Sequence, residues 1–270
     1  MTQIRCIISS LSPYSDSGHE LTLIFSLRIT LILLLVLCLP AQAAELRVAV
    51  ASNFLITLER LADAFAYETG HRIKLSSGST GKLYTQIRAG APYDLFLAAD
   101  SERPRLLESE GRILPESRMT YARGQLAFWS REAGIEISVD ELQSNPPKRL
   151  ALANAKTAPY GRAAEQALKS LDLDALGSLH VRGENIGQTF QLVYSGAAEL
   201  GLVAYSLVLA QQSGSSWLIP TENYEPIEQQ MVIVKRTKQP ELARQFQQWM
   251  LTKGRQIILD DGYLLEPQDG

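Results

Sequence analysis

Cysteine is nearly absent from this chain of 270 residues, and both cysteines, Cys6 and Cys38, lie near the amino terminus. If the first 43 residues are removed, as argued below, the remaining chain has no thiol. Disulfides, cysteine nucleophiles and cysteine metal ligands are then excluded. Histidine is almost as scarce, since only His71 and His180 follow residue 43. We expect His71 to lie at the end of a helix and His180 to be structural.

Common catalytic motifs are missing as well. The chain contains neither a GxSxG nor an HExxH pattern. The segment Gly78–Lys82 (GSTGK) is similar to a phosphate-binding loop, but Ser76 and Leu83 stand where that motif needs Gly and Ser or Thr. Asp94 and Asp100 flank a short predicted strand without a second carboxylate pair at metal-ligand spacing. We therefore expect no enzyme and no cation site, and a structural role for Asp94 near the mouth of a cleft.

The first 43 residues have the pattern of a secretory signal peptide. A short apolar stretch, Ile29–Leu39, is followed by the small-residue pattern Ala41-Gln42-Ala43. This stretch is well short of the roughly 20 residues that a membrane-spanning helix needs. We expect an exported protein that begins at Ala44. Residues 1–26 are polar, and we interpret them as an over-long gene start.

The charge balance bears on the choice of partners. The chain has a formal net charge of −3 with scattered basic residues, which argues against nucleic acid as a partner. A small anion bound at one place remains compatible with this balance. The length after residue 43 suits one or two α/β domains.

From Ala44 onward, strand-like and helix-like segments alternate. The clearest helix is predicted over Leu55–Glu68, where apolar residues recur at helical spacing, and Gly70 is expected to end it. Alternation of this kind is typical of a parallel sheet covered by helices. A last helix is predicted over Glu241–Leu251.

Two long extended segments, Met119–Ser130 and Tyr224–Val234, interrupt the alternation and flank a second set of alternating units. They indicate that the chain leaves a first domain and later returns to it. We therefore predict an α/β protein with two lobes, discontinuous domains and a cleft between the lobes. The predicted bounds are 44–123 and 225–270 for lobe I and 124–224 for lobe II.

Polar groups follow four of the predicted strands, each just before a helix. These junctions are Ser52-Asn53, Gly78-Ser79-Thr80, Ala158–Gly161 and Ile186–Thr189. Free backbone N–H groups, hydroxyls and amides at helix starts can hold an anion with neutral atoms. A single Ser or Thr more often only caps its helix, and Tyr160 can instead pack its ring against the core. Four junctions together favour an anion site.

Five segments resemble the molybdate-binding proteins of ABC transporters. They are Val50–Phe54 (VASNF), Gly78–Tyr84 (GSTGKLY), Gly90–Phe96 (GAPYDLF), Ala158–Gly161 (APYG) and Glu184–Gln188 (ENIGQ), and the match covers residues 46–267 in order. The resemblance implies the type II periplasmic binding-protein fold. It also implies a periplasmic, monomeric protein without a cofactor that captures molybdate or tungstate in the interlobe cleft and delivers it to a membrane permease.

The resemblance also implies which residues bind the oxyanion. They are Ser52, Asn53, Ser79 and Thr80 from lobe I, and Tyr160 and Ile186 from lobe II, the last through its backbone N–H. Molybdenum would be held by them only as molybdate, not as a cation. Some family members have a ligand tyrosine near Tyr205, but the alignment places Ala204 at that position, so Tyr205 is not expected in the site.

The chemistry of the junctions supports this interpretation. An oxyanion that is fully ionised at neutral pH needs donors and no acceptor, whereas phosphate would need an acceptor for its remaining proton. None of the four junctions carries an acidic residue, which favours molybdate, tungstate or sulfate.

Two alternatives stay open. The first is a binding protein of the same fold for sulfate or another small anion. Arg162 would favour a carboxylate if it pointed into the cleft, but we expect it to face solvent. The second is an exported hydrolase, which the missing catalytic cluster disfavours.

Overall fold

The structure, a computed structural model, describes residues 43–265. The predicted signal peptide, apart from Ala43, lies outside the described residues and stays a prediction, as does the interpretation of residues 1–26. Within the described part of the chain, no helix is long and apolar enough to cross a membrane.

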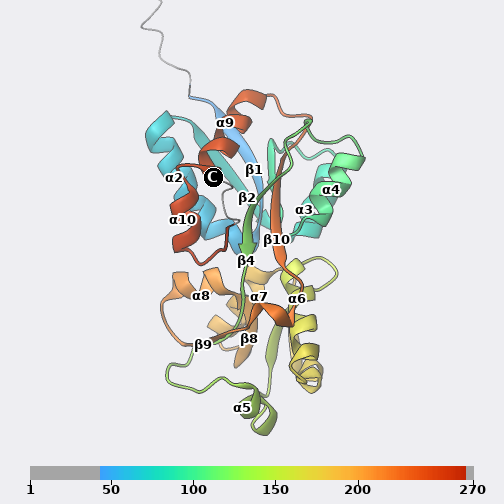
Figure 1. Cartoon of the computed structure of the whole chain (residues 1–270), viewed down its shortest axis with the longest axis vertical. Helices are drawn as coiled ribbons and strands as arrows, with labels where there is room; N and C mark the ends of the chain where they lie inside the picture. The colour runs from blue at the N-terminus through green and yellow to red at the C-terminus, as the bar shows by residue number, and fades with distance from the viewer. Residues whose placement is uncertain (1–42, 266–270) are drawn as a thin grey trace, which may run out of the picture. The chain divides into compact units, whose positions relative to one another are not determined.

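In residues 43–265, ten strands form two sheets of five strands each (Figure 1). In the first sheet the order is β2 (Arg72–Gly78), β1 (Glu45–Ala51), β3 (Leu95–Leu97), β10 (Ile227–Ile233) and β4 (Met119–Gly124). In the second sheet it is β7 (His180–Gly183), β6 (Leu150–Ala153), β8 (Leu200–Ala204), β5 (Leu126–Ser130) and β9 (Ser215–Leu218). Each sheet belongs to one lobe, so the two-lobed α/β organisation is confirmed.

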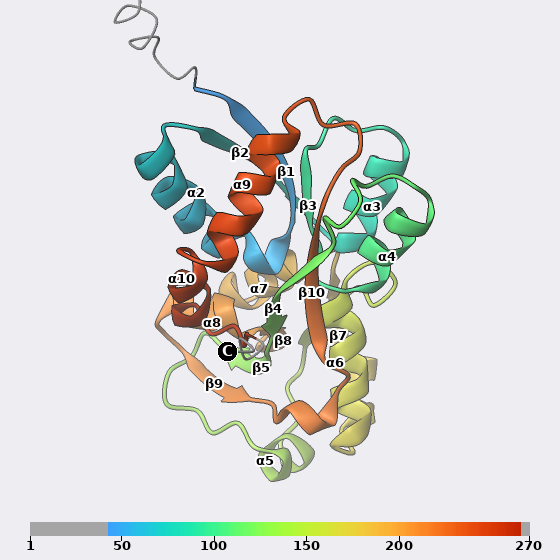
Figure 2. The ribbon, with the colours of Figure 1, turned by 45° about the horizontal axis from the view of Figure 1, so that its top comes forward.

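The expected parallel sheets are found, except that the strands next to the crossovers run antiparallel to their neighbours. Strands β1, β2 and β3 run parallel, and so do β6, β7 and β8. Strand β10 is antiparallel to β3 and β4, and β5 is antiparallel to β8 and β9. The chain leaves the first sheet along β4 and returns along β10, so these two neighbours run in opposite directions (Figure 2).

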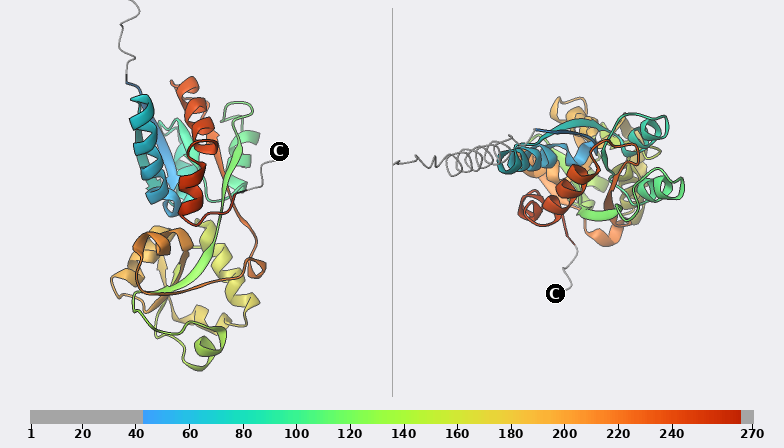
Figure 3. Two further views of the ribbon diagram at one scale, coloured as in Figure 1. Left: turned by 60° about the vertical axis from the view of Figure 1, so that its left-hand side comes forward. Right: turned by 90° about the horizontal axis from the view of Figure 1, so that it is seen from above.

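Helices cover both faces of the first sheet (Figure 3). On one side lie α2 (Leu55–Thr69), α9 (Pro240–Leu251) and α10 (Arg255–Asp260), and on the other α3 (Thr80–Arg88) and α4 (Glu102–Ser109). Strand β1 is apolar on both faces for this reason: Leu46, Val48 and Val50 pack on the α2 side, and Ala49 packs on the α3 side. The predicted helix α2 is confirmed, and Gly70 ends it at φ 75°.

The second sheet carries α5 (Val139–Ser144), α6 (Pro159–Ser170), α7 (Ile186–Tyr194) and α8 (Tyr205–Gln211). Its core is a single cluster that includes Trp129, stacked on Phe190 of α7 at 4.4 Å between ring centroids. Short 3-10 helices occur in both lobes: η1 (Ser52–Phe54) follows β1 of the first sheet, η2 (Asp174–Leu179) follows α6, and η3 (Thr221–Asn223) follows β9.

Asp94 has the expected structural role but lies elsewhere than expected. Its carboxylate accepts from the backbone N–H of Arg47 at 2.8 Å and from Thr237 Oγ1 at 2.6 Å. Because these partners lie near the amino end of β1 and after β10, Asp94 is at the end of β3 away from the pocket described below. His71 accepts from the backbone N–H of Ala44 at 3.2 Å and so tethers the start of the first strand.

Candidate anion-binding site

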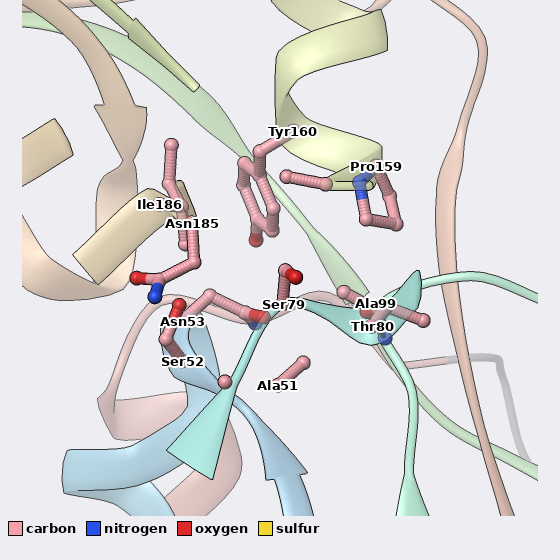
Figure 4. A pocket seen from close by; sticks show the side chains of 12 residues that line it. Ala51, Ser52, Asn53, Ser79, Thr80, Ala99, Pro159, Tyr160, Asn185 and Ile186 are labelled. Carbon is pink, nitrogen blue, oxygen red and sulfur yellow. Dashed lines mark hydrogen bonds between the residues drawn. The ribbon is translucent and has the colours of Figure 1, made fainter. Parts of the chain in front are cut away.

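A small pocket lies where the carboxyl ends of β1 and β2 meet the amino ends of α6 and α7 (Figure 4). It contains all six residues that the sequence predicted. The lining residues are Ala51, Ser52, Asn53, Gly78, Ser79, Thr80, Ala99, Ala158, Pro159, Tyr160, Asn185 and Ile186. None of these twelve residues is charged. The four junctions therefore meet at one place, with two junctions from each lobe.

The size of the pocket limits what it can hold. Its volume is about 10 Å³, which corresponds to roughly one water-sized sphere. A sugar or a nucleotide does not fit this arrangement of the lobes. A compact ion is the class of ligand that matches.

The first-lobe half begins where β1 ends. Ser52 and Asn53 form the first turn of η1, and the first amides of a helix have no partner within it. Ser52 Oγ accepts from the backbone N–H of Gly187 at 3.1 Å, so its own hydrogen remains available. This bond also joins the two lobes at the edge of the pocket.

Ser79 precedes α3 at the N-cap position, but its side chain makes no capping hydrogen bond. Its hydroxyl is buried without a partner among the described residues. Capping, the commoner role for such a serine, is therefore not what this hydroxyl does. Thr80 Oγ1 accepts from the backbone N–H of Ala99 at 3.1 Å and is equally buried.

The second-lobe half consists of two helix starts. Helix α6 begins with Pro159, which suits the first helical position because it lacks an N–H. Tyr160 follows, 1% exposed, and its hydroxyl points toward Ser52, Asn53 and Ser79 (Figure 4). Helix α7 begins at Ile186 after Asn185, whose side chain accepts from Gln188 N–H at 2.9 Å. The backbone N–H of Ile186 is thus a first-turn amide beside the pocket.

Gly161 explains how α6 comes so close to β6. A Cβ at this position would lie 2.5 Å from the carbonyl oxygen of Ala153 and 2.8 Å from Ala155 N. Only glycine permits this approach of the helix start to the strand end. The approach brings Tyr160 to the pocket.

The structure adds one residue to the predicted set and corrects the expectation for another. Asn185 lines the pocket but was not predicted as a site residue, although it lies within a segment that carries the resemblance. Tyr205, which was not expected in the site, is not among the lining residues. Arg162 does not simply face solvent: its guanidinium lies 2.7 Å from Glu102 Oε2 and 3.5 Å from Asp100 Oδ2, across the two lobes.

This chain is similar to known proteins over most of its length. A model of the family described as bacterial extracellular solute-binding protein matches residues 46–264. The molybdate-binding protein ModA of Azotobacter vinelandii is 42% identical over 236 residues, which cover 85% of this chain and 94% of that protein. The ModA protein of Rhodobacter capsulatus is 35% identical over 238 residues, with coverage of 87% and 94%.

This chain belongs to the bacterial extracellular solute-binding proteins. A solved structure, that of the Azotobacter vinelandii periplasmic molybdate-binding protein, matches with a TM-score of 0.79 and 41% identity, covering 82% of this chain and all of that one. The predicted type II binding-protein fold is confirmed.

The pocket of this solute-binding protein presents uncharged hydrogen-bond donors. Burial raises the pKa of Tyr160 well above its ordinary value of 10, so its hydroxyl keeps its proton at physiological pH. The amino ends of α6 and α7 add partial positive charge without a buried cation. The arrangement can bind a small anion through hydrogen bonds alone.

Proposed function

We propose that this solute-binding protein is the substrate-binding component of an ABC importer and that its substrate is molybdate. The observation that carries the proposal is the pocket, which is lined by uncharged residues from both lobes and bordered by helix amino ends. The similarity to two molybdate-binding proteins, both more than 30% identical over most of their length, supports the choice of anion.

The donor chemistry suits a tetrahedral dianion. A buried charge is tolerated only when hydrogen bonds replace its hydration, and bonds to a charged acceptor are stronger than neutral ones. Ser52, Ser79, Thr80 and Tyr160 supply hydroxyls, and Asn53 and Ile186 supply first-turn amides. These six residues are the proposed ligands. Molybdenum would be bound only as the oxyanion, so no protein atom coordinates it as a metal cation.

One observation favours a different anion. Asn53 Oδ1 is buried and has no partner among the described residues, while its Nδ2 donates to Gln229 Oε1 and to Tyr263 Oη. An acceptor without a partner would suit a protonated oxyanion such as hydrogen phosphate. Sulfate, which has no proton at neutral pH, is the second alternative. The sequence relatives favour molybdate over both, and tungstate has the same charge and shape as molybdate.

Capture follows from the arrangement of the lobes. We propose lobe I as residues 44–123 and 225–270 and lobe II as 124–224, and the membership of β4 and β5 in different sheets supports this division. An anion that contacts donors from both lobes at once stabilises the closed arrangement over the open one. The closed protein, a periplasmic monomer without a cofactor, would then deliver its anion to the membrane permease. No hydrolytic activity is proposed.

Isothermal titration of residues 44–270 with molybdate, tungstate, sulfate and phosphate tests the proposal. Tight one-to-one binding of molybdate and tungstate, without binding of the other two, is expected at neutral pH. Preference for sulfate or phosphate would leave the fold and the pocket in place and overturn the assigned anion. Repeating the phosphate titration at two pH values would show whether Asn53 Oδ1 accepts a hydrogen bond from the protonated ligand.

A further inference from the structure

Gln229 lies directly behind the pocket and contacts residues of both halves of the site. It is in β10, fully buried, and does not line the pocket itself. Its Oε1 accepts from Asn53 Nδ2 at 2.9 Å and from the Tyr121 hydroxyl at 2.9 Å. Its Nε2 donates to the Tyr160 hydroxyl at 3.3 Å. One carboxamide therefore joins a proposed ligand of lobe I to a proposed ligand of lobe II.

The hydrogen bond between Gln229 and Tyr160 depends on a glycine at position 124. Gly124 ends β4, just before the chain passes to the second lobe. A Cβ at Gly124 would lie 2.0 Å from the Tyr160 hydroxyl oxygen and 2.7 Å from Gln229 Nε2. These distances are too short for any side chain, so the hydroxyl of Tyr160 reaches Gln229 only because position 124 is glycine.

We propose that Gln229 is a positioning residue that orients the Tyr160 hydroxyl toward the bound anion and couples the two half-sites. The proposal rests on the proposed function of the pocket. Because Tyr160 Oη accepts from Gln229 Nε2, its own hydrogen is directed away from Gln229 and toward the pocket. When lobe II moves away, Tyr160 loses this partner, so the orienting bond exists only in the closed arrangement.

The chemistry of the position requires an amide. The side chain must accept from Asn53 and Tyr121 and donate to Tyr160, and only a group with both donor and acceptor atoms does this. Glutamate would accept from all three and would place a negative charge behind an anion site. Methionine has nearly the same length and neither strong donor nor strong acceptor.

The test compares Gln229→Met and Gln229→Glu with wild type in titrations with the same four anions. We expect Gln229→Met to weaken binding by about tenfold, the order expected when a hydrogen bond that orients a donor to a charged group is lost. Gln229→Glu should weaken binding further. It keeps the shape of the side chain but buries a charge, so the urea midpoint of unfolding is measured for both variants beside their affinities.

A double-mutant cycle with Tyr160→Phe separates positioning from general stability. Without the Tyr160 hydroxyl, Gln229 has no second-lobe donor to orient, so Gln229→Met should then change affinity by less than about threefold. Gln247→Met is the matched control, because Gln247 is a buried glutamine of α9 whose Nε2 donates to Ser117 O at 2.9 Å, away from the pocket. It should lower the urea midpoint of unfolding and leave affinity unchanged. Additive effects of Gln229→Met and Tyr160→Phe would overturn the proposal.

Failure of the proposed function gives a different result. If wild type binds sulfate or phosphate instead of molybdate, the same cycle is run with that anion and the role of Gln229 is tested unchanged. If wild type binds none of the four, the contact is tested on anion-free protein by X-ray scattering. Gln229→Met should then raise the radius of gyration because the lobes separate more often. An unchanged radius would overturn the proposal.

Discussion

Arg162 of α6 donates to Glu102 of α4 across the two lobes, with 2.7 Å between Nη1 and Oε2. A second ion pair of this kind joins Lys82 of α3 to Glu184, which follows β7, at 2.5 Å. The closed arrangement is therefore held by charges outside the pocket as well as by donors within it. Both pairs are partly exposed, so each is expected to contribute modestly.

Replacing Arg162 by methionine should weaken anion binding by up to about fivefold, because an exposed ion pair contributes about 0.2–1 kcal/mol. The loss should shrink at high salt, since screening weakens the wild-type pair. Titration at low and high ionic strength measures both effects. Arg182→Met is the matched control: Arg182 pairs with Glu165 at 3.5 Å within lobe II. Equal losses in the two variants would show that the cross-lobe pair does not hold the lobes together.

The ion pair between Arg162 and Glu102 also predicts that stability depends on pH. The hydrogen bond from Arg162 lowers the pKa of Glu102 below the ordinary value of 4.5. A carboxyl whose folded-state pKa is lowered adds stability that is present above pH 4.5 and is lost as the pH falls through the folded-state pKa. The free energies of unfolding of wild type and Arg162→Met should therefore converge in acid. Urea titrations at neutral pH and below pH 4.5 check this, and a constant difference would contradict it.

Ser52→Ala should reduce affinity for the bound anion by about 1–3 kcal/mol, the usual loss for a hydrogen bond to a charged group. Ser52 Oγ already accepts from Gly187 N–H, so the hydrogen that it donates is free for the ligand. Asn53→Ala keeps the backbone amide that is the proposed donor, so its loss of affinity should be smaller, and it should destabilise the fold because the Asn53 side chain bonds to Gln229 and Tyr263. Isothermal titration measures both.

Ser195→Ala is the control for these two variants, since Ser195 is an exposed serine at the end of α7 whose hydroxyl donates to Leu192 O. It should bind the anion as wild type does. Wild-type affinity in Ser52→Ala would remove the Ser52 hydroxyl from the proposed site.

The site was predictable from sequence where the chemistry is local. Ser52, Ser79, Tyr160 and Ile186 each follow a strand and begin a helix, and the carboxyl ends of parallel strands meet at one edge of a sheet. Gln229 was not predictable, because its partner Asn53 is 176 positions away and nothing in its own segment distinguishes it from a structural glutamine. Such contacts depend on how the crossover strands pair.

The pairing of the sheet strands and the cross-lobe contact of Arg162 also depend on residues that are distant in the sequence. The two crossovers were predicted from the extended segments, but the antiparallel pairing of β10 follows only from where the returning strand inserts, between β3 and β4. Arg162 was assigned to solvent because a helix position beside a glycine reveals nothing about the opposite lobe. Local patterns predicted the elements, and long-range pairing decided the rest.

Gly161→Ala should destabilise the protein by about 1–3 kcal/mol, the usual penalty for overpacking. The added Cβ would meet Ala153 O at 2.5 Å, and backbone atoms cannot move aside as a flexible side chain can. Gly177→Ala is the control, because a Cβ there meets nothing within 4 Å. Urea unfolding measures both variants, and affinity should fall in Gly161→Ala as well, since α6 would shift Tyr160. Equal stability of the two variants would contradict the packing at α6.

Buried tyrosines behind and within the pocket predict a loss of stability in alkali. Burial raises the pKa of Tyr121, Tyr160 and Tyr263 above the ordinary value of 10. Above pH 10 the unfolded chain therefore releases protons that the folded chain keeps, and the free energy of unfolding falls by about 1.4 kcal/mol per pH unit for each such tyrosine. Tyr263→Phe should make this fall less steep in urea titrations between about pH 9 and 11. An unchanged slope in Tyr263→Phe would show that this phenol ionises in the folded protein.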